Sequence, residues 1–558
     1  MLFMIIELGF ETPYWFQLFV SYLYLITLGF GAITIIVRYL GFQIPKIHIL
    51  LSDLLILTIF SFSLYNAFYD IIDAYQKSFI LFAVIILFLR ELSTINIQYK
   101  QSFKNPAQLF GISFFFLVVF GAFFLYLPNS TTNGIHFIDA LFTSVSAVCV
   151  TGLCSVDTAT TFTLLGKSIL LVLIQIGGLG IMTFASYFSF FFKGSTSYQN
   201  TLVLGNITNS QKIGKVFSTL KNIILVTFIF ELIGAISIYF CLDPNQFTSE
   251  FERIYFSIFH SISSFNNAGF STLPNGLYEY TYRFNYPLHI IISFLFILGG
   301  LGFPIVFNIF NYFKYAILRV INSFLRKKRF HHMPWILNLN SRLILFTSFI
   351  LIFGGSILIF IFEYNHSLSD HSFFGKCITA FFSATTPRTA GFNTIDMATQ
   401  SFPTIMIVIL LMWIGASPAS TGGGIKTSTI ALASLNIISL AKGKDRIEIF
   451  GREISDNSIK RSFAAIFLSL FVIGIAILII GAIEPELSFL HIIFECFSAY
   501  STVGLTMGIT SELSSISKCV LMFVMFIGRV SMLTILIALF EQVKFTSYKT
   551  PKEEILIN

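Results

Sequence analysis

Apolar segments of two lengths follow one another along this chain. Three of them, near residues 16–38, 48–66 and 78–90, fill the first hundred residues, with Asp70 and Asp73 between the second and the third. A helix that crosses a bilayer needs about 20 predominantly apolar residues. We therefore expect residues 1–104 to form an accessory module of two or three transmembrane helices.

From about residue 105 the pattern repeats. Each unit holds a long apolar helix, a polar connection, a short apolar segment that ends in glycine, and a second long helix. The segment Phe137–Leu153 is too short to span a bilayer, and Gly152 lets its chain leave the helical conformation. Non-helical backbone at membrane depth is tolerated where it lines a water-filled cavity, which predicts a re-entrant pore helix. The predicted units cover residues 105–200, 201–330, 331–455 and 456–558.

Matched positions support the repeat. Each unit has a phenylalanine ten residues before its glycine, and a serine or threonine six residues before it. Such agreement in all four units makes coincidence an unlikely source of the pattern. The expected fold class is an all-α polytopic membrane protein with four helix–pore-loop–helix repeats around a central pore. The glycines are Gly152, Gly269, Gly391 and Gly504, and the hydroxyl residues are Ser146, Ser263, Thr385 and Ser498.

The tripeptides that end in these glycines are the candidate ion-binding residues. Rings of backbone carbonyls can replace the hydration water of a cation without introducing charge. The C-terminal end of a pore helix is partly negative and favours a cation beside it. The alternative is four ordinary helix–loop–helix corners. The candidates are Val150, Thr151, Gly152, Asn267, Ala268, Gly269, Thr389, Ala390, Gly391, Thr502, Val503 and Gly504.

The second helix of the third unit is expected to be interrupted within the apolar run 402–440. Pro418 and three consecutive glycines disfavour helical hydrogen bonding there. A flexible loop directly below the filter would block the permeation path, so we predict a gate, with a kink of no gating role as the alternative. The gate residues are Gly415, Ser417, Pro418, Thr421, Gly422, Gly423, Gly424 and Lys426, together with Arg529.

Arg529 lies near the centre of the apolar segment 519–540. An arginine at that depth should face the pore or a buried partner. It would raise the barrier for permeating cations or bind carbonyls of the interrupted loop; the alternative is a structural arginine that pairs with Glu495 or a helix end. Asp139 opens the first pore helix, where a carboxylate suits the helix N-terminus.

Composition and charge place the chain in a membrane. It has 558 residues, 55% of them hydrophobic and 11% charged. Lys and Arg gather in the loops between units and in the C-terminal tail, which predicts that these parts are cytoplasmic. The six cysteines show no metal or pairing pattern. A polytopic membrane enzyme should show clustered acidic residues and histidines, and the nine histidines of this sequence are scattered. We expect no enzyme, no tightly bound cofactor and no nucleic-acid partner.

Several ordered motifs resemble the Trk/Ktr/HKT superfamily of potassium transporters. They are AVCVTGL at 147–153, QIGGLGIMTF at 175–184, NNAGFS at 266–271, TAGFN at 389–393, ASPASTGGGIKT at 416–427, STVGL at 501–505 and GRVSMLT at 528–534. The resemblance covers about residues 105–541, and implies that the four glycines belong to a selectivity filter and that residues 415–427 and Arg529 form an intramembrane gate. The apolar stretch before the first unit is longer than the two-helix extension of bacterial Trk members.

The resemblance also implies a transported ion and partners. Gly152 favours potassium over sodium, with a sodium-conducting or sodium-coupled transporter of the same architecture as the alternative, and Na⁺ as a possible co-ion or activator. Family members work as homodimers, and bacterial ones associate with a cytosolic nucleotide-binding regulatory subunit of the RCK type. The expected location is the bacterial plasma membrane (cell or inner membrane), with several passes through it.

Overall fold

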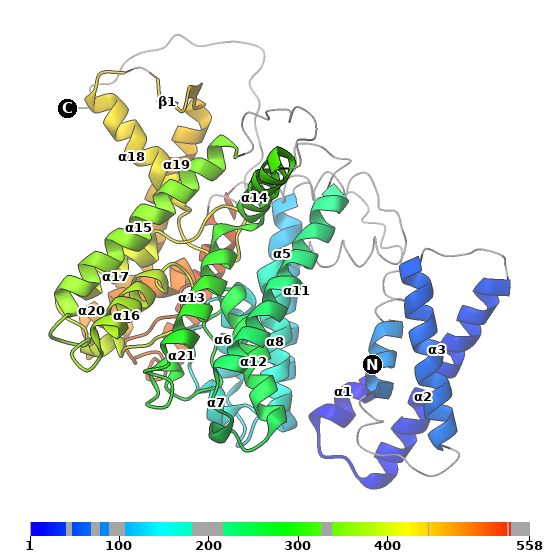
Figure 1. Cartoon of the computed structure of the whole chain (residues 1–558). Coiled ribbons are helices and arrows are strands. Elements are labelled where there is room, and N and C mark those ends of the chain that lie inside the picture. The colour runs from blue at the N-terminus through cyan, green and yellow to red at the C-terminus, as the bar shows by residue number, and fades with distance from the viewer. Residues whose placement is uncertain are drawn as a thin grey trace, which may run out of the picture.

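The structure is a computed structural model that describes residues 2–40, 47–67, 79–88, 106–180, 216–324, 337–444, 446–532 and 535–536. Most of these residues lie in helices (Figure 1). Within them, a single two-residue hairpin forms the strands β1 (Glu448–Ile449) and β2 (Arg452–Glu453). The predicted all-α fold class is confirmed.

The N-terminal helices form a bundle beside the main body (Figure 1). It contains α1 (Leu2–Gly9), α2 (Tyr14–Leu40), α3 (Ile47–Ala67) and the helix Phe79–Phe88. These helices share an apolar core of their own. The bundle contacts the body where the Asn129 side chain donates to the Leu8 carbonyl over 3.1 Å. The three predicted apolar segments are therefore helical, while the short α1 was not predicted.

Four units of one design build the main body. Each begins with a long helix, continues with a short pore helix, and ends with a second helix that leads away from the turn. The units are α5 (Pro106–Leu125), α6 (Phe137–Cys149) and α8 (Leu164–Leu179); α11 (Val216–Cys241), α12 (Glu250–Phe265) and α13 (Tyr286–Leu301); α15 (Leu339–Glu363), α16 (Phe373–Thr385) and α17 (Phe402–Trp413); and α19 (Asp456–Ile483), α20 (Phe489–Ser501) and α21 (Ser515–Val530).

Further elements connect these helices. They are α7 (Thr158–Thr161), α14 (Phe303–Phe324), α18 (Thr427–Ala441) and the 3-10 turns Pro128–Ser130, Pro244–Gln246, Gly276–Tyr278 and Met397–Thr399. Three predicted unit boundaries, after residues 104, 200 and 330, fall outside the described residues, as does most of the C-terminal tail. The boundary after residue 455 lies between β2 and α19.

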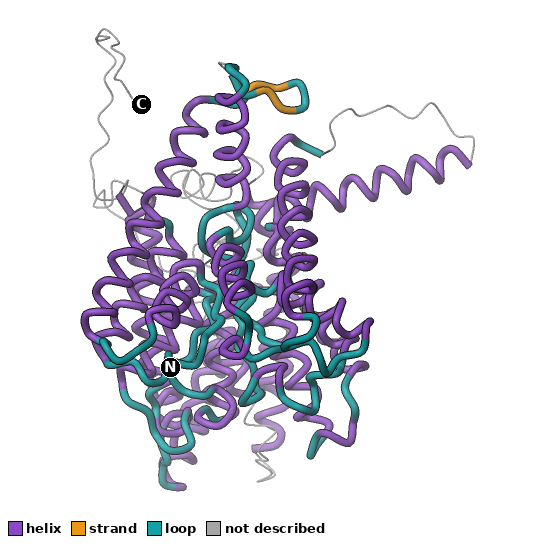
Figure 2. Tube along the Cα trace, turned by 90° about the vertical axis from the view of Figure 1, so that its left-hand side faces the viewer, coloured by secondary structure: helices purple, strands orange, loops and turns teal. Residues whose placement is uncertain are grey.

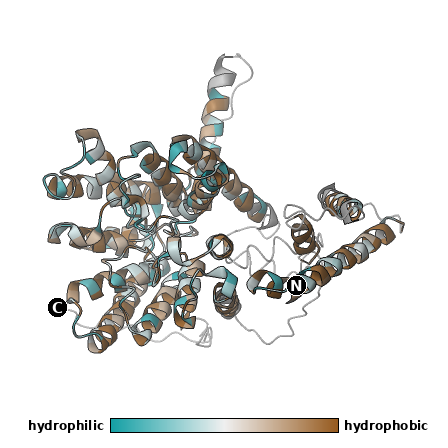
Figure 3. Cartoon of the chain, turned by 90° about the horizontal axis from the view of Figure 1, so that it is seen from below, coloured by the Kyte–Doolittle hydropathy of each residue, from teal (hydrophilic) through white to brown (hydrophobic). Residues whose placement is uncertain are grey.

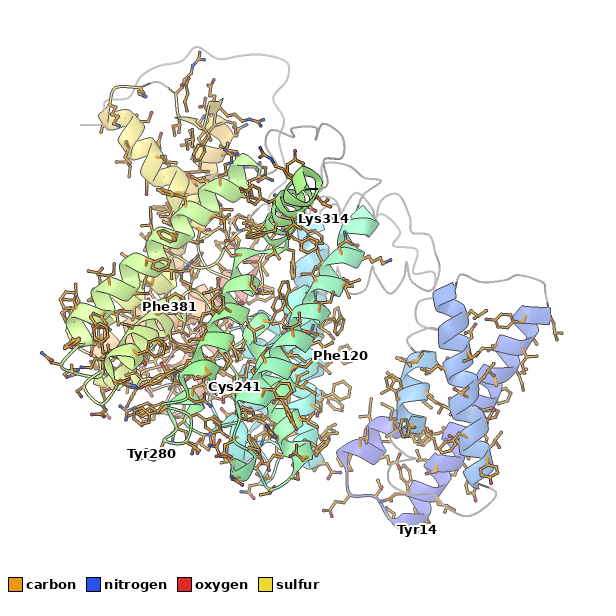
Figure 4. The ribbon with its side chains drawn as sticks, in the orientation of Figure 1. Tyr14, Phe120, Cys241, Tyr280, Lys314 and Phe381 are labelled. Atoms are coloured by element: carbon orange, nitrogen blue, oxygen red, sulfur yellow. The ribbon has the colours of Figure 1, made fainter. Side chains whose placement is uncertain are left out.

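Length and apolarity make several helices able to cross a membrane. Among the described residues, Tyr14–Val37, Leu220–Cys241, Leu339–Glu363 and Asp456–Ile483 meet both conditions. The helix α13 and residues Phe303–Arg319 of α14 meet them only as a pair, which is bent by 106°. Large apolar side chains such as Phe120 point outward from the body (Figure 4). Seen from below, the outer helices of the body carry many apolar residues, with polar ones among them (Figure 3). This surface suits lipid rather than water.

The second helices are not continuous, contrary to our expectation of a long helix in each unit. The helices α8, α13 and α21 end at residues with positive φ, which are Gly180 (79°), Gly302 (83°) and Ser531 (75°). A left-handed residue ends a helix because the backbone can no longer make the next helical hydrogen bond. In the third unit the helix ends at Trp413, where the sequence had predicted an interruption.

Apolar cores join units that are distant in the sequence. One core combines α5, α6 and α8 with α19 and α21, so the first and fourth units pack together. A second core lies around α11, α12 and α13, and a third joins the third unit to the fourth. The four units therefore close on one another, and their pore helices all end inside the body.

Candidate functional site

The four turns after the pore helices share one backbone conformation. In each turn, the glycine and the residue two positions before it have positive φ. Left-handed backbone costs a residue with a side chain roughly 1–2 kcal/mol, and such strain persists only where surrounding structure holds it. The non-glycine residues are Val150 (59°), Asn267 (61°), Thr389 (77°) and Thr502 (50°).

The four glycines lie against one another in a closed ring. An ideal Cβ at each glycine would collide with a backbone carbonyl oxygen of the next unit. The fourth glycine makes this contact with the first unit, which closes the ring. Positive φ adds a second reason for glycine at each position. The ideal Cβ would lie 2.4 Å from the Ala268 oxygen at Gly152, 2.9 Å from the Ala390 oxygen at Gly269, 2.3 Å from the Val503 oxygen at Gly391 and 2.2 Å from the Thr151 oxygen at Gly504.

Hydroxyl groups of the pore helices brace these turns. Ser146 Oγ accepts the Gly152 N–H over 3.0 Å, and Ser498 Oγ accepts the Gly504 N–H over 3.1 Å. Ser263 Oγ donates to the Phe270 carbonyl over 2.8 Å, and Thr386 Oγ1 donates to the Phe392 carbonyl over 2.6 Å. In the third unit the bracing residue is thus Thr386.

Thr385, which matches the three bracing serines in spacing, does not take this role. Thr385 Oγ1 donates to the carbonyl of Phe381 within its own helix, over 2.8 Å. The sequence match at this position indicated the repeat and assigned no bracing side chain, so the role of Thr386 is a finding of the structure.

Residues 414–427 form the predicted interruption between α17 and α18. Ile414 and Ile425 pair as an isolated parallel bridge. The backbone groups freed from the helix find other partners, as buried polar groups must. Ser417 N–H donates to the Gly300 carbonyl over 3.0 Å, and Thr427 N–H donates to the Ala416 carbonyl over 3.2 Å. The loop is therefore held by α13 as well as by itself.

This loop contacts three of the four turns, each at the residue two positions before the glycine. Thr421 Oγ1 donates to Asn267 Oδ1 over 3.0 Å. Gly423 N–H donates to Thr502 Oγ1 over 2.9 Å. A Cβ on Gly422 would lie 2.1 Å from Thr389 Oγ1. The sequence had marked these turn residues for ion binding, and the structure adds that their side chains reach the loop.

Two cationic side chains bind carbonyl groups of the same loop. The Arg529 guanidinium donates to the Thr421 carbonyl and, over 2.6 Å, to the Gly177 carbonyl on α8. Lys426 Nζ donates to the Gly422 carbonyl over 2.7 Å. Glu495 instead accepts from the hydroxyls of Thr506 and Thr510, so the alternative pairing of Arg529 with Glu495 is not found.

Sequence reasoning missed two buried polar contacts between helices of the body. Lys518 Nζ binds Asp139 Oδ1 over 2.8 Å, which links α21 to α6. Glu231 accepts from the side-chain amides of Gln175 (3.2 Å) and Asn266 (2.9 Å). A lone carboxylate in the apolar helix α11 was a usable signal for the second contact. No sequence pattern signalled the first, because its partners are 379 residues apart.

The arrangement offers oxygen atoms of backbone turns around a narrow centre. Partly negative ends of pore helices point at the same centre. Among the described residues, no three His, Cys, Asp or Glu side chains gather as metal ligands. A cation at this ring would therefore meet neutral carbonyl oxygens, the ligands that serve dehydrated monovalent cations in selectivity filters.

Known proteins resemble this chain over most of its length. The Ktr system potassium uptake protein B of Bacillus subtilis is 36% identical over 453 residues, which are 81% of this chain and 96% of that protein. The potassium/sodium uptake protein NtpJ of Enterococcus hirae is 36% identical over 461 residues, 81% of this chain and 97% of that protein.

A solved structure and a family model complete the comparison. The crystal structure of the potassium transporter TrkH from Vibrio parahaemolyticus matches with a TM-score of 0.63 at 16% identity, and covers 94% of this chain and 97% of that one, which supports the fold. The family model described as TrkH, cation transport protein, matches residues 70–548. The chain therefore belongs to the TrkH family of cation transport proteins.

Proposed function

We propose that this protein takes up potassium through the ring of four turns, and that the ring is its selectivity filter. The supporting observation is the closed contact of Gly152, Gly269, Gly391 and Gly504, each against a carbonyl of the next unit. Backbone carbonyls in such a ring replace hydration water around a potassium ion. Relatives named as potassium uptake proteins agree with this proposal.

The loop at residues 415–427 acts as the gate in this proposal. It lies against the turns through Thr421, Gly422 and Gly423, where it would block an ion that leaves the ring. Arg529 and Lys426 hold its carbonyl groups and add positive charge below the filter. Both effects raise the barrier for a cation until the loop moves.

The proposed setting is the plasma membrane of a bacterium. We place the loops between units and the C-terminus in the cytoplasm, because they carry most of the Lys and Arg residues. The described basic residues Lys442 and Lys444 follow α18, at the end of the molecule that carries the β1–β2 hairpin (Figure 1). We propose that the protein works as a homodimer with a separate cytosolic RCK-type regulatory subunit.

A second candidate is a sodium-conducting or sodium-coupled transporter of the same architecture. The relative NtpJ, named a potassium/sodium uptake protein, is as similar to this chain as the potassium uptake protein of Bacillus subtilis. Glycine at all four filter positions favours potassium uptake over this second candidate. With glycine there, no side-chain hydroxyl enters the ring of backbone carbonyls.

Flux through the purified protein in liposomes tests the proposal. We expect potassium flux to exceed sodium flux, and Gly152→Ser to reduce this preference by about tenfold or more, which is roughly 1.4 kcal/mol of lost discrimination. Its added Cβ would meet the Ala268 carbonyl at 2.4 Å. Gly134→Ser is the matched control, because Gly134 has positive φ and no atom within 4 Å of its Cβ.

Two results would contradict the proposal. Sodium flux equal to potassium flux in the wild type would favour the second candidate. An unchanged ion preference in Gly152→Ser would argue against the ring as the filter. Uptake in a bacterium that lacks its own potassium transporters, supplied with the regulatory partner, gives an independent measurement.

A further inference from the structure

Helix α14 leaves the direction of the membrane-crossing helices. It turns by 106° from α13 at Gly302. Figure 2 shows a helix that extends sideways from the upper part of the body and then continues into an undescribed segment, as α14 does. We place α13 and its neighbours across the bilayer, and a helix at this angle to α13 would then run along the membrane surface.

One face of α14 is apolar and exposed. Phe310, Phe313 and Ile317 are 64%, 59% and 56% exposed, and their spacing places them on one side of a helix. Tyr312 and Arg319 lie on the opposite side, and Lys314 lies at the edge of the apolar side. A helix with one aromatic, apolar face and one polar face lies in a membrane interface with the apolar face among the acyl chains.

The charge of α14 matches an anionic lipid surface. The helix carries Lys314 and Arg319, both exposed, and no Asp or Glu between Phe303 and Phe324. Lys314 lies at the end of the molecule opposite Tyr280 (Figure 4). Basic residues beside a cytoplasmic leaflet are attracted to its anionic lipids. A second copy of α14 would instead repel the first through the same charges.

The start of α14 is anchored to α15 and lies close to the loop that we propose as the gate. The Asn308 side chain donates to Ser341 Oγ on α15 over 2.9 Å, and Ile305 is buried. At the bend, a Cβ on Gly302 would lie 2.8 Å from the Pro418 carbonyl oxygen and 3.0 Å from that of Ala419. Because the bend packs closely against the loop at residues 415–427, a change in the tilt of α14 would shift this contact.

We propose that α14 binds the anionic lipid surface of the cytoplasmic leaflet and couples that binding to the gating loop, so that ion flux depends on anionic lipid. This inference rests on the proposed function and on the cytoplasmic placement of α14. The lipid contact of α14 can be measured without measuring ion flux. A failure of this inference is therefore distinguishable from a failure of the proposed function.

Brominated acyl chains test the lipid contact. The full-length protein is placed in vesicles of brominated phosphatidylcholine with about 30% phosphatidylglycerol. Ile317→Trp should show strong quenching of its added fluorescence relative to wild type. Tyr312→Trp, on the opposite face of the same helix, should show little quenching. Equal quenching of the two would overturn the placement of α14, whether or not the protein conducts ions.

Flux in the same vesicles tests the coupling. Anionic lipid should change potassium flux by about threefold or more, and the double variant Lys314→Gln/Arg319→Gln should lose most of this dependence. The matched control is Lys460→Gln/Arg461→Gln, which removes two exposed charges at the start of α19. Flux that is independent of anionic lipid in the wild type would overturn the coupling. Absence of flux in every vesicle would instead contradict the proposed function.

Discussion

A single hydroxyl connects the fourth turn to the gating loop. Thr502 has positive φ, which its side chain makes unfavourable, and its Oγ1 accepts the Gly423 N–H over 2.9 Å. Threonine is therefore retained at a strained position where it makes a contact that valine, as found at Val150, would not make. The same position thus serves both the ring and the loop.

Thr502→Val should weaken the closed loop. The substitution keeps the shape of the side chain but leaves the Gly423 N–H without its acceptor, at a net cost of about 1 kcal/mol. If the gate opens by releasing this loop, potassium flux should rise roughly fivefold. Thr379→Val is the matched control, since that buried hydroxyl has no hydrogen-bond partner among the described residues. Equal flux in the two variants would contradict the role of Thr502.

At the scale of elements, the second helices surround the loop that we propose as the gate. Among the described residues, the third of these helices continues as a loop against the turns. The second bends into α14 at Gly302, and α21 supplies Arg529. The loop is consequently held by two helices of other units, α13 through the Gly299 and Gly300 carbonyls and α21 through Arg529.

Deletion of Gly422–Gly424 should raise potassium flux by about tenfold or more. It removes the contact of Gly423 with Thr502 and that of Gly422 with Lys426, each worth roughly 1 kcal/mol. Liposome flux at matched protein amounts provides the measurement. A deletion variant that is folded and conducts at the wild-type rate would contradict the gate.

A milder substitution reaches the same loop without shortening it. Gly422→Ala would place a methyl group 2.1 Å from Thr389 Oγ1 and 2.7 Å from the Ala416 side chain, so the loop must shift away from the ring. We expect higher flux here too. Gly474→Ala in α19 has open space around its Cβ and should conduct as the wild type does.

The sequence predicted these elements unevenly, for physical reasons. Glycines at matched positions located the four turns, because positive φ and close backbone approach leave few other residues possible. Pro418 and the glycine run located the third break. The break after Val530 had no such signal, since Ser531 adopts positive φ without being glycine. Contacts between units, such as Gly391 with Val503, depend on packing that no local pattern encodes.

At the scale of the whole molecule, closure of the ring depends on contact between the first and last units. Their helices share an apolar core, and Asp139 and Lys518 add an ion pair across the same boundary. Asp139 lies in the first turn of α6, where the helix dipole also favours a carboxylate. The N-terminal bundle has a separate core and touches the body near Asn129, so it is not needed to close the ring.

Loss of the Lys518 charge should therefore loosen the boundary between units one and four. The two side chains are 11% and 13% exposed, and Lys518→Gln leaves the Asp139 carboxylate nearly buried without its partner, at a cost of about 2–4 kcal/mol. A lower midpoint of thermal unfolding in detergent would report this. The double variant Lys518→Met/Asp139→Asn should recover most of the loss, because no unpaired charge stays buried. Asp370→Asn, which breaks the exposed pair with Arg283, should change the midpoint little. If Lys518→Gln unfolds at the same temperature as Asp370→Asn, the ion pair does not hold the ring closed.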